Sequence, residues 1–216
     1  MGRASKEDTQ KAARPSLREQ QKRLTRQRLL EAAEAVFKER GYAHTTIDDI
    51  VEYAGASRGT YYLYFKNKSG LLADLLGEFN EEAATLFQKF ADIDEPDAEN
   101  LAEWCASHIQ LYRAHRHVIA AWIQAESAEP DLRPTADGYL NIALDTLSEH
   151  IGVLRHAEGL SDDAAEVRLR ATLMMVQLER LCYFALIRRW KTDLDAAARL
   201  LGEIWLQTIY SGDVHD

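Results

Sequence analysis

Proline, glycine and cysteine are all scarce in this chain, which has 4 Pro, 11 Gly and 2 Cys among 216 residues. Few backbone breakers, combined with 46% hydrophobic residues, favour a folded helical protein and exclude one that is disordered throughout. Cys105 and Cys182 lie 77 residues apart, each within an apolar pattern. We therefore predict reduced, buried thiols and no disulfide framework.

Long apolar runs are missing as well. The most apolar stretch, residues 173–187, is interrupted by Gln177, Glu179 and Arg180, and it is shorter than the roughly 20 apolar residues that cross a membrane. No apolar segment with a small-residue cleavage site follows the charged N-terminus, so a signal peptide is not indicated. We expect a cytoplasmic protein without a membrane partner.

The motifs of common catalytic and metal sites are also missing. The sequence has no Gly-rich phosphate loop, no Gly-x-Ser-x-Gly elbow and no His-Glu-x-x-His pair. Cys105 and His108 are one helical turn apart, but a zinc site needs three or four ligands. The acid pair Asp48-Asp49 is typical of a helix start. We predict that the protein is not an enzyme and uses no metal or cofactor.

Charge is present but unevenly distributed. The net charge is -9, yet residues 1–68 carry 14 Lys and Arg against 9 Asp and Glu, whereas residues 69–216 carry 12 against 26. The first 28 residues alone hold 9 basic and 3 acidic groups. A basic head on an acidic body indicates a polyanion-binding N-terminal end, because contact with phosphates depends on local rather than net charge.

Apolar residues recur at helical spacing along most of the chain, after a basic arm at residues 1–22 that we expect to be flexible. The pattern predicts helices at residues 25–40, 47–54, 58–64, 71–90, 101–112, 116–128, 134–156, 162–190 and 194–210. No strand is predicted. Thr46 and Ser57 are candidate N-caps, and Gly55 lies in the turn between two short helices, as in a helix-turn-helix.

A series of short motifs follows the same order as these helices. They are LEAAEAVF at 30–37, GY at 41–42, TTIDDI at 45–50, AGASRGTYYLYF at 54–65 and KSGLL at 68–72. Over residues 25–76 the chain resembles the DNA-binding domain of the TetR family of bacterial transcriptional regulators, TetR/AcrR type. Val51 and Ser69-Gly70 depart from the usual family pattern, and both lie outside the recognition helix.

The resemblance implies an all-α subunit of about nine helices that acts as a homodimer. It implies three parts: a basic arm at 1–22, a helix-turn-helix DNA-binding domain at 23–68, and an effector-binding and dimerisation domain at 69–216. In that family a small molecule usually releases the protein from operator DNA. The implied partners are therefore double-stranded operator DNA, a small-molecule effector and a second copy of the chain.

The start of the second helix of a helix-turn-helix faces base edges in the major groove. The candidate DNA contacts are Thr46, Ser57, Arg58, Gly59, Thr60, Tyr61, Tyr62, Tyr64 and Lys68. Arg58 is suited to guanine or to a phosphate. Gly59 permits close approach to DNA or only relieves helix packing. Thr46, Ser57 and Lys68 have phosphate-contact and purely intramolecular alternatives.

The tyrosines and the arm extend this prediction. By resemblance, Tyr62 and Tyr64 contact phosphate or the groove wall, whereas Leu63 and Phe65 pack inward. The basic arm either follows the DNA backbone or is a solubilising tail. Its residues are Arg14, Arg18, Lys22, Arg23, Arg26 and Arg28.

The C-terminal part supplies bulky apolar residues with a few polar tips, as a small-molecule pocket requires. The candidate ligand contacts are Trp104, His108, Tyr112, Trp122, Tyr139, Met174, Met175 and Gln177, with plain core as the alternative for each. His108 and Gln177 are the polar groups within apolar runs, so they need partners. These residue types favour an apolar or aromatic effector.

The segment 164–189 is apolar on nearly all sides and must be covered on more than one face. We predict that a second subunit covers one face, so that the homodimer forms through the last two helices. Two functions remain open at this point. One is a ligand-responsive repressor of a palindromic operator. The other is an architectural, nucleoid-associated DNA-binding protein whose helical body binds another protein.

Overall fold

The computed structural model describes residues 16–129 and 132–212, except for the side chains of 133–136 and 139. All regular structure in these ranges is helical, which confirms the predicted all-α class. The helices are α1 (Leu17–Arg40), α2 (Ile47–Ala54), α3 (Arg58–Tyr62), α4 (Lys68–Ala91), α5 (Ala98–Ala128), α6 (Arg133–Ala157), α7 (Ala164–Cys182) and α8 (Leu194–Tyr210). A π-helical turn, η2 (Tyr183–Ile187), continues α7.

The first helix begins earlier than predicted. Residues 17–22 belong to α1 rather than to a flexible arm, because Ser16 and Glu19 form a capping box. The Ser16 Oγ accepts from the Glu19 N–H at 3.3 Å, and the Glu19 carboxylate accepts from the Ser16 N–H at 2.7 Å. The rest of the predicted arm, residues 1–15, lies outside the described residues.

The segments predicted at 101–112 and 116–128 form one helix, α5. It begins at an Asp97–Asn100 capping box and has no Pro or Gly in its interior, so nothing interrupts the backbone hydrogen bonds. The predicted helix 58–64 is also corrected, because α3 ends at Tyr62 and the Leu63 N–H turns back to the Thr60 carbonyl at 3.2 Å.

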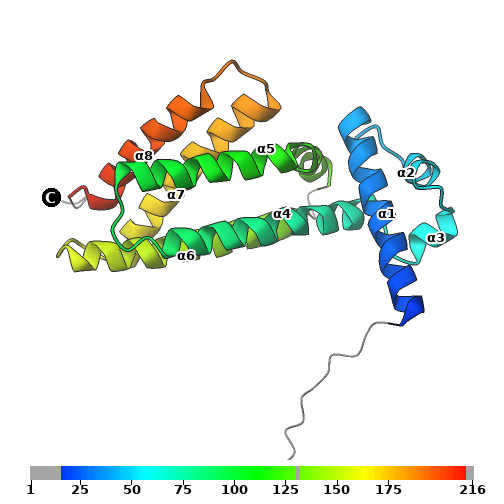
Figure 1. Cartoon of the computed structure of the whole chain (residues 1–216), viewed down its shortest axis with the longest axis horizontal. Helices are drawn as coiled ribbons and strands as arrows, with labels where there is room; N and C mark the ends of the chain where they lie inside the picture. The colour runs from blue at the N-terminus through cyan, green and yellow to red at the C-terminus, as the bar shows by residue number, and fades with distance from the viewer. Residues whose placement is uncertain (1–15, 130–131, 213–216) are drawn as a thin grey trace, which may run out of the picture.

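The described residues form two hydrophobic cores, one around α1–α3 and one within α4–α8, and Figure 1 shows α1–α3 at one end of the long helices α4 and α5. We call α1–α3 the N-terminal bundle and α4–α8 the helical body. The core of the N-terminal bundle also contains residues from the start of α4 and from the end of α5, among them Leu72 and Trp122. These two helices therefore join the N-terminal bundle to the body, and the first core crosses the boundary expected at residues 68–69.

The second core fills the helical body, where α5 and α8 lie side by side (Figure 1). Trp104 and Trp205 pack there with ring centroids 5.5 Å apart. Cys105 and Cys182 are buried free thiols, as predicted, and burial raises the pKa of Cys105 to about 12. No described helix combines the length and apolarity that would let it cross a bilayer.

A buried ionic cluster closes the end of the body farthest from the N-terminal bundle. Arg155 donates to the carbonyls of Ile209 at 2.7 Å and Ser211 at 2.9 Å, and so satisfies the last turn of α8. Glu166 accepts from Arg155 at 3.3 Å and from Arg170 at 2.5 Å. All three side chains are buried, so the cluster ties α6, α7 and α8 together.

Candidate nucleic-acid interface and ligand cavity

Local hydrogen bonds fix the entry to the helix-turn-helix. Thr46 caps α2: its Oγ1 accepts from the Asp49 N–H at 3.2 Å, and the Asp49 carboxylate accepts from the Thr46 N–H at 2.8 Å. The hydrogen bonds from Thr46 lower the pKa of Asp49. Gly55 ends α2 in the left-handed region with φ 59°, where glycine is free of the Cβ penalty.

The first residues of α3 are exposed, as a recognition helix requires. Ser57 caps α3 by accepting from the Thr60 N–H at 3.0 Å. Arg58 donates to both carboxylate oxygens of Asp48, at 3.0 and 2.9 Å, which holds its guanidinium beside the start of α2. A Cβ added at Gly59 would have Ser57 Oγ at 3.7 Å as its nearest neighbour, an ordinary contact. The fold itself therefore does not require glycine there.

Two assignments within the tyrosine run are wrong. Tyr61 is 0% exposed and donates its hydroxyl to the Asn67 carbonyl at 3.0 Å, so it is a core residue rather than a DNA contact. Leu63 was expected to pack inward, yet it is 78% exposed because α3 ends one residue before it. Tyr62 is half exposed and Tyr64 is partly buried, while Phe65 is buried as predicted.

Lys68 also has a role within the protein. Its Nζ donates to the carbonyls of Tyr42 at 2.6 Å and Thr45 at 2.8 Å, and it lies 3.9 Å from the centroid of the Tyr42 ring. Burial lowers its pKa. Two of the three ammonium donors are thus used to hold the α1–α2 turn against α4, which supports the intramolecular alternative for Lys68, and its phosphate contact stays a prediction.

The basic residues of α1 divide into two groups. Arg18, Lys22 and Arg23 are exposed on the first turns of α1, which project beyond the rest of the N-terminal bundle (Figure 1). Arg26 pairs with Asp74 of α4 at 2.5 Å, and Arg28 donates to the carbonyl at the end of α2. Arg26 and Arg28 therefore brace the helix-turn-helix. Arg14 lies outside the described residues.

The helical body contains a partly open cavity of about 640 Å³. The lining comes from α4, α5, α6 and α7, and most of it is apolar. Its residues are Leu76, Gly77, Phe79, Asn80, Glu81, Ala83, Ala84, Thr85, Phe87, Gln88, His108, Tyr112, Ile119, Trp122, Leu140, Ile142, Ala143, Thr146, Met175 and Glu179. Its volume is within the range of small-molecule sites.

The cavity contains half of the predicted ligand contacts. They are His108, Tyr112, Trp122 and Met175. Trp104 and Met174 lie in the core instead, where the Trp104 indole N–H donates to the Leu86 carbonyl at 2.8 Å. Gln177 is exposed on α7, so it is neither a buried polar group nor part of the lining. The side chain of Tyr139 is outside the described residues.

The sequence analysis did not predict that residues of α4 line the cavity. Phe79, Asn80 and Phe87 face the cavity from this helix, and across from it Glu179 of α7 lies 3.1 Å from His108 Nε2. The apolar spacing of α4 signalled a buried face without showing whether that face meets a core or a cavity. Asn80 marks the cavity only in the structure, where its amide Nδ2 is buried and has no hydrogen-bond partner among the described residues.

The last turns of α5 contact the N-terminal bundle directly. The Gln124 side-chain oxygen accepts from the Tyr42 N–H at 3.0 Å, and the Tyr42 hydroxyl donates to the Glu129 carboxylate at 2.5 Å. Burial, followed by these interactions with Glu129, raises the pKa of Tyr42. Trp122 lines the cavity and also belongs to the core of the N-terminal bundle. One helix therefore reaches both the cavity and the α1–α2 turn.

Comparison with known proteins identifies the helix-turn-helix. Residues 29–75 match the family model for bacterial regulatory proteins of the tetR family. The chain belongs to the TetR family. This is a family of DNA-binding transcriptional regulators rather than of enzymes.

Relatives of this TetR-family chain include proteins that match it well beyond the helix-turn-helix. The fatty acid metabolism regulator protein of Bacillus subtilis is 29% identical over 199 residues, covering 88% of this chain and 98% of its own. The repressor BepR of Brucella suis is 28% identical, covering 66% and 70%. The crystal structure of FadR from Bacillus subtilis in complex with stearoyl-CoA shares the fold, with TM-score 0.64, 22% identity and coverage of 87% and 98%.

We expect Gln124→Ala to weaken the contact between α5 and the α1–α2 turn of this TetR-family protein. The change removes the acceptor of the Tyr42 N–H and leaves that donor without its partner at a partly buried turn. The expected cost is about 1–2 kcal/mol, which lowers Tm by about 4 °C for a chain of this size. Differential scanning calorimetry measures the shift.

Gln110→Ala is the matched control for this change. Gln110 is exposed on the same helix, and its side-chain oxygen accepts from the neighbouring Arg113 at 3.1 Å. Its replacement should leave Tm within about 1 °C. Equal shifts in Tm for the two variants would show that the Gln124 hydrogen bond does not stabilise the contact between α5 and the α1–α2 turn.

Proposed function

We propose that this protein is a cytoplasmic, ligand-responsive repressor. In this proposal a homodimer places two recognition helices, α3, in successive major grooves of a palindromic operator, and a small apolar effector releases it. Membership in the TetR family supports DNA binding and transcriptional regulation. The response to an effector rests on the cavity and on its connection to the N-terminal bundle.

Trp122 is the observation that carries the proposal. It contacts the cavity on one side and the core of the N-terminal bundle on the other. A molecule that fills the cavity must displace or fix this side chain, and the residues two and seven positions further along, Gln124 and Glu129, contact Tyr42. Ligand binding can thereby favour one orientation of the recognition helix over another, which is what release requires.

An apolar stripe on the outer face of the body supports the homodimer. Leu169, Leu173 and Val176 follow at i, i+4 and i+7 on α7, and each is about half exposed. Leu200 of α8 is also exposed. Apolar stripes of this kind are characteristic of protein interfaces. Covering the stripe with the same stripe of a second copy gives the two-fold symmetry that a palindrome needs.

The cavity supports an effector with a large apolar part. It extends along α4 from Leu76 to Gln88, which is about 18 Å at the rise of an α-helix. FadR from Bacillus subtilis, which shares the fold, was crystallised with stearoyl-CoA. An elongated apolar group is the feature of such a ligand that this cavity suits.

Selection of genomic fragments by the purified protein tests the proposal. An enriched inverted repeat near a few promoters is the expected result, and analytical ultracentrifugation of the complex should give two chains per repeat. Binding without a common motif would contradict the operator and favour the architectural alternative. A monomer on DNA would contradict the homodimer.

We expect Arg58→Ala to reduce affinity for the selected repeat about 10- to 100-fold, as loss of one good base or phosphate contact does. Asp48→Asn should instead raise the affinity for the repeat, because it removes the carboxylate that holds and partly neutralises Arg58 in the free protein. Fluorescence anisotropy at fixed salt measures both affinities.

Lys89→Ala controls for the loss of one positive charge, since Lys89 is exposed near the far end of α4. Its affinity should stay within twofold of the unchanged protein. An Arg58→Ala variant that also stayed within twofold would remove Arg58 from the DNA interface.

A further inference from the structure

The described lining of the cavity holds more carboxylates than basic groups. Among the described residues that line it are two carboxylates, Glu81 and Glu179, and one histidine, His108. No lysine or arginine belongs to that part of the lining. An apolar cavity bordered by carboxylates favours a cation over an anion, because the field of an ionised group is weakly screened there.

Glu179 is placed to meet a ligand inside the cavity. One carboxylate oxygen of Glu179 lies 3.1 Å from His108 Nε2. The Glu179 side chain is 34% exposed, so it is partly buried and still accessible to a ligand. The negative charge of Glu179 is, after burial, the next contribution that raises the pKa of Tyr112. Its field therefore acts on the wall of the cavity one helical turn beyond His108.

The nearest cation on the same helix offsets this charge only in part, because Arg180 lowers the pKa of Tyr112 less than Glu179 raises it. Arg180 is exposed and its guanidinium lies over the rings of Tyr183 and Phe184, at 5.1 and 5.6 Å from their centroids. Neither of these rings lines the cavity in the described structure. Glu179 thus faces the cavity while Arg180 is engaged with aromatic rings outside it.

Aromatic rings also line the cavity that Glu179 faces. Phe87 lies with its centroid 6.1 Å from the His108 ring, and Tyr112 and Trp122 follow along α5. The faces of such rings attract cations within about 6 Å. The Tyr112 hydroxyl can also accept a hydrogen bond from an ammonium group. A carboxylate next to aromatic rings is the combination that binds organic cations.

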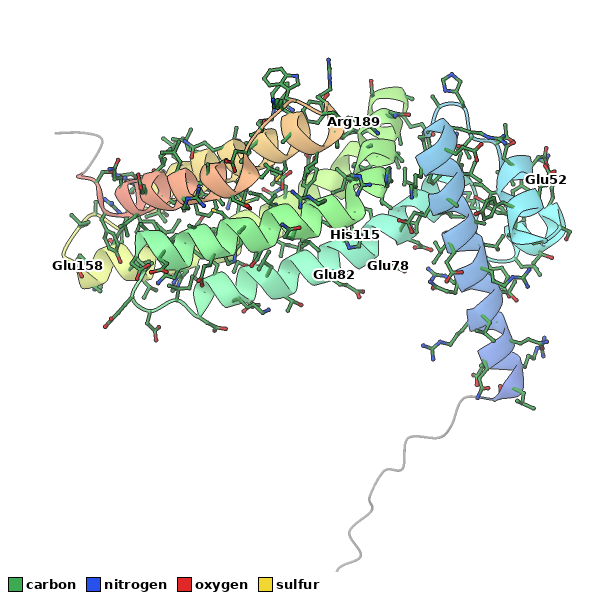
Figure 2. All side chains as sticks on the ribbon, turned by 45° about the horizontal axis from the view of Figure 1, so that its top comes forward. Glu52, Glu78, Glu82, His115, Glu158 and Arg189 are labelled. Carbon is green, nitrogen blue, oxygen red and sulfur yellow. The ribbon has the colours of Figure 1, made fainter. Side chains whose placement is uncertain are left out.

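Further carboxylates lie outside the cavity on the same stretch of α4. Figure 2 shows Glu78 and Glu82 of α4 close to His115 of α5, and the Glu82 carboxylate lies 3.2 Å from His115 Nε2. Together with Glu81 at the cavity they give this surface a negative potential. A positively charged ligand would be drawn towards the cavity, and a polyanion would be repelled.

We propose that the effector is an elongated organic amine, with one positive charge held by Glu179 and an apolar body along α4. This inference rests on the proposed ligand-responsive function and specifies the chemistry of its ligand. It separates this chain from FadR of Bacillus subtilis, whose crystal structure is a complex with stearoyl-CoA. The phosphates of a coenzyme A group would find no lysine or arginine among the described lining residues.

Calorimetric titration of the full chain with four ten-carbon probes tests the proposal. The probes are decylamine, 1-decanol, decanoate and decanoyl-CoA, each below the concentration at which it forms micelles. Decylamine should bind at least tenfold more tightly than 1-decanol, and decanoate and decanoyl-CoA should bind more weakly than either. A tighter complex with decanoate or decanoyl-CoA, or no complex with decylamine, would overturn the inference.

The variant Glu179→Gln isolates the charge. It should lose the tenfold preference for decylamine and keep its affinity for 1-decanol within twofold, which also shows that the cavity is intact. Glu103→Gln, an exposed position on α5, should leave both affinities unchanged. An undiminished preference in Glu179→Gln would refute the role of this carboxylate.

Operator binding, followed in the same samples, separates this inference from the function on which it rests. Release by decylamine supports both. Release by decanoyl-CoA but not by decylamine overturns the amine and leaves the ligand-responsive repressor in place. Absence of any sequence-selective DNA binding before ligand is added contradicts the repressor itself.

Discussion

Glu166→Gln is expected to destabilise the protein by about 3–5 kcal/mol, the usual cost of leaving a buried charge without its partner. Glu166 is the carboxylate that both Arg155 and Arg170 contact, and the two arginine side chains are 0% and 6% exposed. Glutamine keeps the shape of the side chain but removes its charge, so the buried ion pairs that Glu166 forms with Arg155 and Arg170 would both be lost. At about 2–4 °C per kcal/mol, Tm should fall by roughly 10 °C.

Asp145→Asn is the matched control, because it removes a carboxylate that pairs with an arginine at the surface. The Arg168–Asp145 pair is formed by side chains that are 39% and 68% exposed. Pairs of this kind contribute less than about 1 kcal/mol. Thermal melts of both variants should be recorded at one protein concentration, since dimerisation would make Tm depend on it. A Glu166→Gln shift no larger than that of Asp145→Asn would show that the buried cluster does not stabilise the body.

The ionic cluster of Arg155, Glu166 and Arg170 was not predicted from the sequence. Arg155 and Arg170 lie in amphipathic helices in which charged residues are normally exposed. Their burial follows from the end of α8, whose carbonyls need donors: Arg155 bonds to Ile209, and Arg170 bonds to Thr208 at 2.6 Å. These carbonyls need protein donors only after α6, α7 and α8 have packed together and excluded water from the end of α8.

Predictions from local signals succeeded best in the helix-turn-helix. The Thr46 and Ser57 caps and the left-handed Gly55 depend on residues within three or four positions, so α2 begins and ends at the predicted residues. Burial within α3 depends on packing against α1 and α4 instead. That is why Tyr61 and Leu63 were assigned to the wrong sides while the start of the helix was correct.

The division of α5 had a different cause. The buried apolar residues from Leu101 to Tyr112, and Ile119, face the core of the body, whereas the core of the N-terminal bundle contains Val118, Ala121, Trp122 and Ala125. The apolar face changes direction where the helix passes from one core to the other, so the periodicity is interrupted while the backbone is not. Because α5 packs against two different cores, the apolar periodicity predicted two helices in place of one.

The cavity was only half predictable for the same reason. Met174 and Met175 are neighbours on α7, and one lies in the core while the other lines the cavity. On a helix that is apolar on nearly all sides, the sequence does not say which stripe faces inward, and Gln177 was placed on the wrong one. Asn80 and Glu179 become informative only when α4, α5 and α7 are seen together.

Gly202→Ala is expected to cost about 3 kcal/mol, the upper part of the range for inserting an atom into a packed core. A Cβ at this position of α8 would lie less than 3.0 Å from the Ala98 carbonyl oxygen, the Ala102 nitrogen and the Ala102 Cβ of α5. Two of these atoms belong to the backbone, so no side-chain rotation relieves the overlap. The helices α5 and α8 must separate or shift, which also disturbs the Trp104–Trp205 packing between them.

Gly77→Ala distinguishes this overlap from the general effect of replacing a helical glycine. No atom outside its own helical surroundings would lie within 4 Å of the new Cβ, and alanine is the better helix former by about 1 kcal/mol. Gly77→Ala should therefore melt at or above the temperature of the unchanged protein, while Gly202→Ala melts roughly 6–12 °C below it. Because α5 also carries Trp122 and Gln124, displacement of α5 should reach the N-terminal bundle, so that operator affinity falls in Gly202→Ala even at temperatures where the protein is folded. Unchanged Tm and operator affinity in Gly202→Ala would mean that α5 and α8 are not in close contact at this position.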